Sequence, residues 1–367
     1  MIALLIVDSA VATFCYFVDP DLSFVITLSV LVFTCPCAIA LATPAAFAAA
    51  GSRLSQLRLL VTNGNAIESL SRATLAMFDK TGTLTIGEPR IAAVFVIDNA
   101  YTEKDCRLIA AALEHASTHP LARAFAMQEA LPAVSSPNIV IGQGVSGKVD
   151  GREWRIGNAE FVGGGVAADD STTTHVFLGV DGHAVAWFDL EDELRPDAKQ
   201  TLNALRQLGL KTSLVSGDNK AAVESVAEAL DIRDTHYACT PGNKLTIIEA
   251  AQQAGERVVM IGDGINDAPV LAGADTSVAP AHGALLAQTS ADVIMLGESL
   301  TPLTTAIEMS RKTMRIVRQN LAWAIVYNTL ALPLAAAGFV PPWLAAIGMS
   351  ASSLVVVLNA LRLNRFE

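Results

Sequence analysis

Apolar runs mark both ends of the chain, while the middle alternates short apolar and polar stretches as globular domains do. Residues 1–18 form an apolar run whose only charged residue is Asp8, and a second run covers 22–50. Two more runs lie near 320–338 and 343–361. Because a membrane-spanning helix needs about 20 apolar residues, the pattern predicts four such helices, arranged as two hairpins around a globular middle.

A cleaved signal peptide is the alternative for the first run, which lacks a basic amino-terminal region and a clear cleavage site. Basic residues gather beside the other three runs: Arg53, Arg58, Arg311, Lys312, Arg315, Arg318, Arg362 and Arg365. The positive-inside rule makes that side cytoplasmic. We therefore expect an integral membrane protein with a cytoplasmic globular middle.

Strand and helix patterns alternate in much of this middle section. A buried strand is expected at 74–78, and the alternation resumes from Asp189 to about Leu300. The elements expected there are helices at 196–208, 220–230 and 243–254 and strands at 210–215 and 257–261. Such alternation predicts a doubly wound, parallel α/β sheet.

Residues 88–188 interrupt this sheet and have the pattern of a separate α+β unit. Its strands are expected near 91–97, 138–149 and 152–156, with a hairpin at 175–188 around Asp181-Gly182.

Composition then narrows the classes of function. With 52% hydrophobic residues and a mean hydropathy of +0.43, the chain is too apolar for a purely soluble protein. Its net charge of −11 argues against a nucleic-acid partner, since such proteins gather Lys and Arg. The five cysteines, two of them in Cys35-Pro36-Cys37, do not suggest a secreted disulfide framework and indicate a reducing compartment.

Polar residues follow three of the expected strands. Asp79 follows the first and opens the stretch DKTGTLT, Ser216 follows 210–215, and Asp263 follows 257–261 within GDGINDAP. Carboxyl ends of parallel strands meet at one edge, where open α/β sheets bind ligands. An Asp before Gly and Thr often only caps a turn. For Asp79, the polar residues Ser216 and Asp263 expected at the same edge favour the role of a nucleophile instead.

This set suits phosphoryl transfer. Asp79 would attack a γ-phosphoryl group and form an aspartyl phosphate. Lys244 and the hydroxyls of Thr81 and Ser216 would hold the phosphoryl oxygens. The expected Mg²⁺ ligands are Asp79, Asp263 and the main-chain carbonyl of Thr81, supported by Asp267.

The Cys35-Pro36-Cys37 motif lies inside the second apolar run. Proline removes a helix hydrogen bond and opens the turn, so two thiols can face a cavity. Thiolates select soft ions, Cu(I) above all, with Zn²⁺ and other thiophilic ions as alternatives. A proline kink beside two small buried cysteines is the competing structural interpretation.

The fourth apolar run places Met349, Ser352 and Ser353 on one helix face, at spacings of i, i+3 and i+4. A thioether and two hydroxyls opposite the cysteine pair would complete a soft site without fixed charge. The third and fourth runs contain no Asp or Glu, whereas a pathway for a hard divalent ion is expected to carry one. The alternative is that these small residues only pack helices together.

Taken together, DKTGTLT, the Ser-Gly-Asp at 216–218, GDGINDAP and the Cys-Pro-Cys motif resemble the heavy-metal class of P-type ATPases, in the haloacid-dehalogenase superfamily. Tyr327-Asn328 with Pro333, and Met349 with the Ser pair, are similar to its Cu(I) branch. The Ser-Gly-Asp and the carboxyl-terminal sequence resemble the bacterial subgroup that serves cytochrome oxidase assembly. The resemblance adds Lys80 to the catalytic set and implies these Cu(I) ligands: Cys35, Cys37, Tyr327, Asn328, Met349 and Ser352.

The same resemblance makes 88–188 the nucleotide-binding domain. It implies that ATP is held by Glu114, His119, Pro120, Gly142, Gly144, Gly157 and Asn158, with Asp218 from the phosphorylation domain. The sequence has no Walker A loop, so domain closure would bring the phosphates to Asp79.

One departure from the family is the absence of the Thr-Gly-Glu actuator loop, whose Glu directs water onto the aspartyl phosphate. We therefore expect a chain that accepts the phosphoryl group but is poorly equipped to release it. Met1 is then expected to be an internal residue of a longer protein. A shortened chain, a misplaced start and a split gene remain open.

The sequence thus predicts ATP-driven translocation of Cu(I) through an aspartyl phosphate. The alternatives are a Zn(II)-class pump, a membrane-anchored phosphatase and a non-enzymatic copper-binding protein. Thr81 disfavours the phosphatase, because phosphatases of the superfamily carry a second Asp there. Expected partners are membrane lipid, ATP and unidentified copper donors or acceptors, at a bacterial inner membrane. The predicted segments are 1–52 and 320–367 (membrane hairpins), 53–87 and 189–300 (linker and phosphorylation domain), 88–188 (nucleotide domain) and 301–319 (linker helix).

Overall fold

The computed structural model describes residues 9–10, 12–13, 16–17, 20–34, 37–117, 120–140, 142–163, 174–262, 268–281 and 289–365. The chain forms two compact units. Unit 1 comprises Met1–Ala73, Asp292–Met295 and Pro302–Glu367, and unit 2 comprises Thr74–Ala291 and Leu296–Thr301. Four predicted site residues, Cys35, His119, Asp263 and Asp267, lie outside the described residues.

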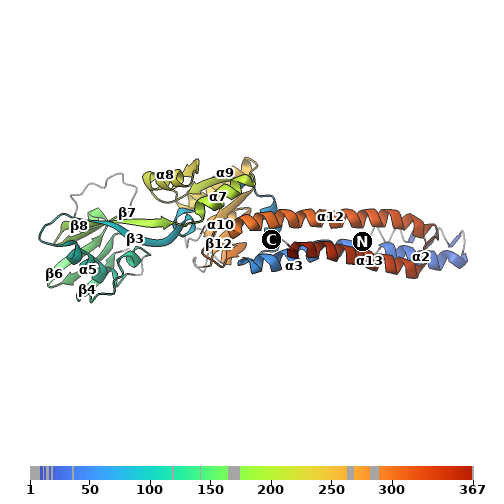
Figure 1. Ribbon diagram of the computed structural model, residues 1–367, viewed down its shortest axis with the longest axis horizontal. Coiled ribbons are helices and arrows are strands. Elements are labelled where there is room, and N and C mark those ends of the chain that lie inside the picture. Colours follow the sequence, from blue (N-terminus) through green and yellow to red (C-terminus); the bar gives the residue numbers. More distant parts are fainter. Residues whose placement is uncertain are drawn as a thin grey trace. The chain divides into compact units, whose positions relative to one another are not determined.

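Long helices dominate the described part of unit 1: α2 (Pro20–Thr34), α3 (Cys37–Gln56), α12 (Pro302–Ala336) and α13 (Pro342–Ala360) (Figure 1). Shorter elements are α4 (Ala66–Ser71), η4 (Leu361–Arg365) and the antiparallel strands β1 (Leu59–Val61) and β13 (Val293–Met295). Gly338, with φ +80°, follows the end of α12, and Pro342 occupies the first position of α13. Glycine after one helix and proline at the start of the next are the usual signals for such a turn.

Two helical stretches of the described chain are long and apolar enough to cross a membrane, Leu22–Gln56 and Pro342–Asn364. They coincide with the second and fourth runs of the sequence. The first run lies mostly outside the described residues. The expected linker helix and the third run form one continuous helix, α12, which contains Pro333 near its carboxyl end.

The first sheet of unit 2 is parallel, with the strand order β12-β11-β2-β9-β10. Its strands are β2 (Leu75–Phe78), β9 (Lys211–Val215), β10 (Asp234–His236), β11 (Val258–Ile261) and β12 (Thr276–Pro280). Every residue of the central strands β2 and β11 is buried, as expected for a parallel sheet covered on both faces. The accompanying helices are α7 (Ala198–Gln207), α8 (Lys220–Ala229), α9 (Pro241–Gln253) and α10 (Ala268–Gly273).

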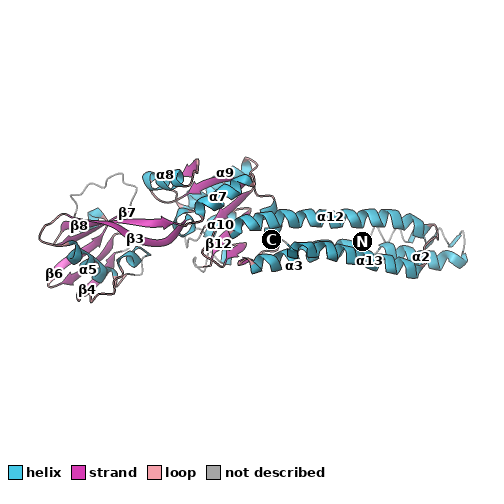
Figure 2. Ribbon diagram, in the orientation of Figure 1, coloured by secondary structure: helices cyan, strands magenta, loops and turns pink. Residues whose placement is uncertain are grey.

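The second sheet is antiparallel, with the order β3-β8-β7-β6-β5-β4, and is coloured magenta in Figure 2. Its strands are β3 (Thr85–Val96), β4 (Ser135–Val140), β5 (Gly144–Val149), β6 (Arg152–Gly157), β7 (Thr174–Val180) and β8 (His183–Leu194). The helices α5 (Glu103–Glu114), η2 (Pro120–Phe125) and α6 (Ala159–Val162) accompany it. Phe125 and Phe188 pack edge to face at 5.0 Å in its core.

Two expectations for this sheet change. The single strand expected at 138–149 is wrong, since Gly142 (φ +75°) lies in a turn that separates β4 from β5. The strand expected at 91–97 begins earlier, at Thr85, so the boundaries drawn at residues 88 and 188 fall inside β3 and β8. The hairpin around Asp181-Gly182 is confirmed, with φ +49° and +83° at these residues, as a two-residue turn of this kind requires.

Candidate functional site

Asp79 stands at the carboxyl end of β2 and is buried, with 7% of its surface exposed. Its backbone N–H donates to the carbonyl of Ile261 on the neighbouring strand (2.8 Å). Lys244, from the first turns of α9, places Nζ 2.7 Å from Asp79 Oδ1 and is itself 6% exposed. The ammonium group of Lys244 thereby compensates the charge of a buried carboxylate.

Three predicted residues meet at the end of β9. Ser216, which is 2% exposed, lies 3.2 Å from Asp218 Oδ2, and its Oγ accepts from the Asp218 backbone N–H (3.2 Å). Lys80 forms an ion pair with Asp218. Because β9 pairs with β2, Ser216 and Asp218 share the sheet edge of Asp79. Lys80, Thr81 and Asp218 also line a cavity of about 1010 Å³ in unit 2.

The edge beside Asp79 offers oxygen donors of the kind that Mg²⁺ prefers. Ile261 pairs with Phe78, so the chain that leads to Asp263 runs beside β2 as far as Gly262. Among the described residues no group of three or more His, Cys, Asp or Glu side chains gathers as a metal site. The carboxylate of Asp79 and the main-chain carbonyl of Thr81, two residues further on, supply oxygen atoms of this type.

The turn η1 (Lys80–Leu84) is held by two residues that the sequence did not single out. Arg195, only 6% exposed, donates from Nε to the carbonyl of Thr83 (2.8 Å) and from Nη2 to that of Gly82 (3.0 Å). Asp192 accepts from the N–H of Gly87 (2.9 Å) and from the hydroxyl of Thr85 (2.5 Å). Arg195 thereby fixes two carbonyls of the turn, and Asp192 fixes the start of β3, which follows the turn.

These two residues lie in the charged stretch 190–197, which has the appearance of a solvated surface. The sequence did offer one signal for Arg195, since it is the one arginine in this acidic stretch and directly precedes Pro196, at the start of the helix expected at 196–208. It did not indicate which carbonyls the guanidinium would reach, because the contact joins positions more than 100 residues apart.

Replacing Arg195 with alanine is expected to destabilise unit 2 by about 2–3 kcal/mol, because buried carbonyls lose a charged donor. The measurement is the midpoint of thermal unfolding of the detergent-solubilised chain. Arg90→Ala serves as the control, since Arg90 forms an exposed pair with Glu193 worth at most about 1 kcal/mol. Equal midpoints for the two variants would contradict the role given to Arg195.

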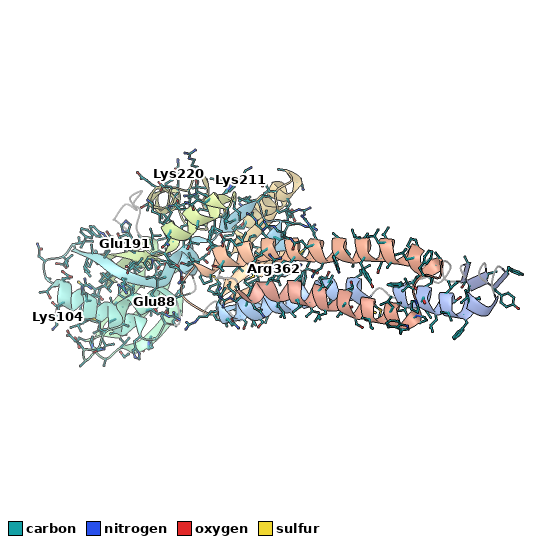
Figure 3. All side chains as sticks on the ribbon, turned by 45° about the vertical axis from the view of Figure 1, so that its right-hand side comes forward. Glu88, Lys104, Glu191, Lys211, Lys220 and Arg362 are labelled. Atoms are coloured by element: carbon teal, nitrogen blue, oxygen red, sulfur yellow. The ribbon has the colours of Figure 1, made fainter. Side chains whose placement is uncertain are left out.

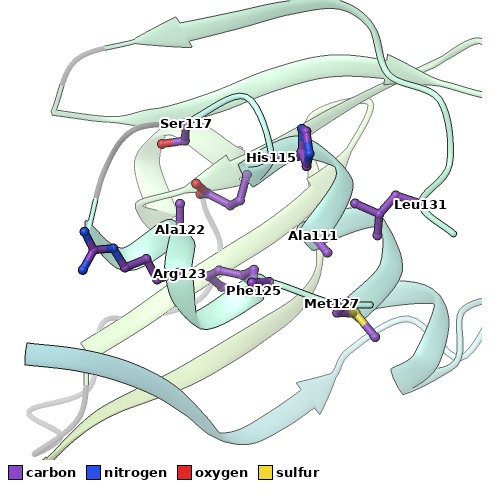
Figure 4. A pocket seen from close by; sticks show the side chains of 10 residues that line it. Ala111, His115, Ser117, Ala122, Arg123, Phe125, Met127 and Leu131 are labelled. Atoms are coloured by element: carbon purple, nitrogen blue, oxygen red, sulfur yellow. The ribbon is translucent and has the colours of Figure 1, made fainter. Parts of the chain in front are cut away.

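Glu114, half-buried at the end of α5, lines a cavity of about 390 Å³ together with His115, Ser117, Arg123 and Phe125 (Figure 4). Burial raises the pKa of Glu114, while a hydrogen bond with Ser117 acts in the opposite direction. The structure does not place Gly142, Gly144, Gly157 or Asn158 among the residues that line this cavity.

Those four residues gather instead where β5 and β6 meet. Gly144 pairs with Gly157, and a Cβ atom on Gly144 would lie 2.0 Å from the carbonyl oxygen of Ile156. Both glycines are therefore required by the close approach of the two strands. Asn158 caps α6, its Oδ1 accepting from the N–H of Phe161 (2.8 Å).

In unit 1, Tyr327 on α12 packs against Phe33 of α2, with ring centroids 5.9 Å apart. Ser352 on α13 is 3% exposed and accepts a hydrogen bond from Trp323 Nε1 (3.1 Å). Cys37, Asn328 and Met349 are partly buried. Ala38, next to Cys37, lies in one apolar cluster with Ala324 and Val356.

Comparison with known families identifies the family to which the parallel sheet and its edge belong. Residues 73–275, which include Asp79, Ser216 and Lys244, match the family model described as haloacid dehalogenase-like hydrolase. The chain belongs to this hydrolase family. Within it, the homologues of the chain are heavy-metal P-type ATPases.

One relative is the nitrogen fixation protein FixI of Rhizobium meliloti, 38% identical over 94% of this chain and 45% of its own length. A second is the probable copper-transporting ATPase PacS of Synechocystis, 34% identical over 97% of this chain and 52% of its own. The chain thus spans about half the length of these relatives. A zinc-transporting PIB-type ATPase in an E2.Pi state superposes with a TM-score of 0.77 at 30% identity, covering 99% of this chain and 62% of the other.

Proposed function

We propose that this chain carries the phosphorylation and ion-gating parts of an ATP-driven pump for Cu(I). The observation that supports it most is the buried Asp79 at the carboxyl edge of β2, paired with Lys244 at 2.7 Å. A nucleophilic carboxylate needs an electrostatic environment that lowers the cost of bringing in phosphate charge. Lys244 supplies a positive charge at that position.

In the proposed reaction an Asp79 oxygen attacks the γ-phosphorus of ATP. The bond between that phosphorus and the bridging oxygen breaks, and ADP leaves with the electron pair. Lys244 and the hydroxyls of Ser216 and Thr81 would hold the transferred phosphoryl oxygens. Bound at Asp79, the Thr81 carbonyl, Asp263 and Asp267, Mg²⁺ would neutralise phosphate charge.

The nucleotide is assigned to the antiparallel sheet, with Glu114, His119, Pro120, Gly142, Gly144, Gly157 and Asn158 as its contacts. Asp218 and Lys80 are assigned to the phosphate side. In support, Lys80, Thr81 and Asp218 share their cavity with residues of β3 and β8, among them Arg90 and Glu191. That cavity gives a triphosphate room to reach the sheet edge.

Unit 1 is assigned to the membrane, which its helices would cross four times. The other segments keep the domain boundaries predicted from the sequence. The transported ion would be bound by Cys35, Cys37, Tyr327, Asn328 and Met349, while Ser352, which the resemblance adds to this set, lies on the same face of α13 as Met349. Thiolate and thioether ligands suit Cu(I), and PacS is named as a probable copper transporter. Zn²⁺ is the second candidate, because a solved structure that is similar over 99% of the chain is described as a zinc-transporting ATPase. The proposed partners are proteins that donate copper to the pump or accept copper from it. The proposed location is a bacterial inner membrane.

The test is labelling of the detergent-solubilised chain with [γ-³²P]ATP and Mg²⁺, in the presence of Cu(I), Zn²⁺ or neither. We expect an acid-stable, hydroxylamine-labile adduct, because aspartyl phosphates have that chemistry. Cu(I) is expected to change its level more than Zn²⁺ does. A folded chain that forms no adduct overturns the proposal, and a response to Zn²⁺ alone reassigns the ion.

A further inference from the structure

Polar and close contacts join α12 to α13 at three successive levels. At the first, Asn320 Nδ2 donates to the carbonyl of Val356 (3.2 Å), and Asn359 Nδ2 donates to Asn320 Oδ1 (2.8 Å). Arg362, labelled in Figure 3, extends this level by donating to Asn359 Oδ1 (2.9 Å).

The second and third levels follow along the same two helix faces. Trp323 Nε1 donates to Ser352 Oγ (3.1 Å). Tyr327 then lies against Gly348, where a Cβ atom would come within 2.5 Å of the phenol oxygen. The residues advance along α12 as they recede along α13, so these contacts define one antiparallel register. We call them the α12–α13 ladder.

Burial makes this register specific. Asn320 is 2% exposed and Ser352 is 3% exposed, among apolar neighbours such as Ala324 and Val356. A shift of one helix by a residue would break the hydrogen bonds of the buried amide and hydroxyl, and a buried polar group that loses its hydrogen bond costs free energy. Gly348 adds a steric constraint, since any side chain there would displace Tyr327.

The ladder lies at the level of described residues on either side of the Cys-Pro-Cys motif. Phe33, before the motif, packs against Tyr327. Ala38, after the motif, clusters with Ala324 and Val356. Phe33 and Ala38, which lie on either side of the motif in the sequence, therefore contact the same stretch of the helix pair.

The chemistry of the middle contact decides the role of Ser352. An indole N–H can only donate, so Ser352 Oγ acts as the acceptor. A hydroxyl oxygen is also a hard ligand, poorly matched to a soft cation. We propose that Trp323 is a positioning residue, that Ser352 is its acceptor rather than a ligand of the transported ion, and that together they hold Tyr327 and Met349 in register with the cysteine motif. This role rests on the proposed function.

The test uses the detergent-solubilised chain, three variants of the contact and two control variants. Trp323→Phe removes the donor, Ser352→Ala removes the acceptor, and a double variant removes both. Trp343→Phe and Ser350→Ala are the matched controls on α13, since Trp343 is 65% exposed and Ser350 bonds only within its own helix. Cu(I) affinity is measured by competition with a chromophoric chelator. The environment of the Trp323 indole is measured as its ¹⁹F NMR chemical shift in chain labelled with 5-fluorotryptophan.

We expect the two single changes to weaken Cu(I) binding equally, by about 3–10-fold, as the loss of one hydrogen bond would do. The double variant should lose no more than either single one. Ser352→Ala should shift the Trp323 resonance, which Ser350→Ala leaves in place.

A loss of affinity in Ser352→Ala alone, with no change in Trp323→Phe, overturns the positioning role and leaves the proposed pump intact. An unmoved Trp323 resonance in Ser352→Ala overturns it as well. Failure of the unmodified chain to bind Cu(I) overturns the proposed function and this role with it.

Discussion

An Asp79→Asn variant is expected to form no detectable phosphoenzyme from [γ-³²P]ATP. The amide keeps the shape of the side chain and an oxygen that can accept from Lys244, but it has no carboxylate to attack phosphorus. Because the proposed reaction forms its covalent bond at a carboxylate oxygen of Asp79, the loss of phosphoenzyme should be complete rather than partial. Acid quenching followed by gel autoradiography measures it.

The control for this experiment is Asp192→Asn. Asp192 lies beside the same turn and contacts Gly87 and Thr85, yet it is not proposed to form a bond to phosphorus. It should label more slowly but still reach a measurable level. Full labelling of Asp79→Asn would show that another residue is the acceptor.

Most of the sheet edge around Asp79 could be predicted from the sequence. Four consecutive buried apolar residues before an Asp predict a central strand that ends in a polar side chain, and β2 has that form. The ends of strands 210–215 and 257–261 were placed within one residue. For 257–261 the reason is a short, fully buried apolar run with clear limits. Neighbouring strands then bring Ser216 to the edge that carries Asp79.

The support for the turn could not be derived in the same way. Arg195 reaches Gly82 and Thr83 because β3 and β8 pair in one register, and no local pattern states that register. The contacts between α12 and α13 are of the same kind. Spacing placed Met349 and Ser352 on one helix face, but Trp323 as the partner of Ser352 depends on how the helices align.

The nucleotide contacts show a different limit. Gly144 and Gly157 were singled out for ligand approach, and the structure gives each a steric reason of its own, since their strands nearly touch there. In the sequence, a glycine required by strand packing looks the same as a glycine required by a ligand. Only geometry separates the two interpretations.

Replacing Lys244 with methionine is expected to be the most destabilising single change at the site. Methionine fills similar volume but leaves the buried carboxylate of Asp79 without its cation, and breaking a buried pair from one side costs about 3–5 kcal/mol. For a unit of this size the midpoint of thermal unfolding should fall by roughly 10 °C. Phosphoenzyme formation should be lost as well, because the incoming phosphoryl group would meet an unscreened negative charge.

The double variant Lys244→Met, Asp79→Asn separates these two effects. With both charges removed, the buried position no longer holds an uncompensated ion, and replacement of a buried pair by neutral groups is often close to neutral in stability. We therefore expect the unfolding midpoint to return most of the way to that of the unmodified chain, while labelling stays absent. Lys211→Met is the matched control, since Lys211 pairs with Glu256 at a side-chain exposure of 73% and should change the midpoint little. A double variant as unstable as Lys244→Met alone would mean that Lys244 stabilises the fold by packing, and that its charge is not matched to Asp79.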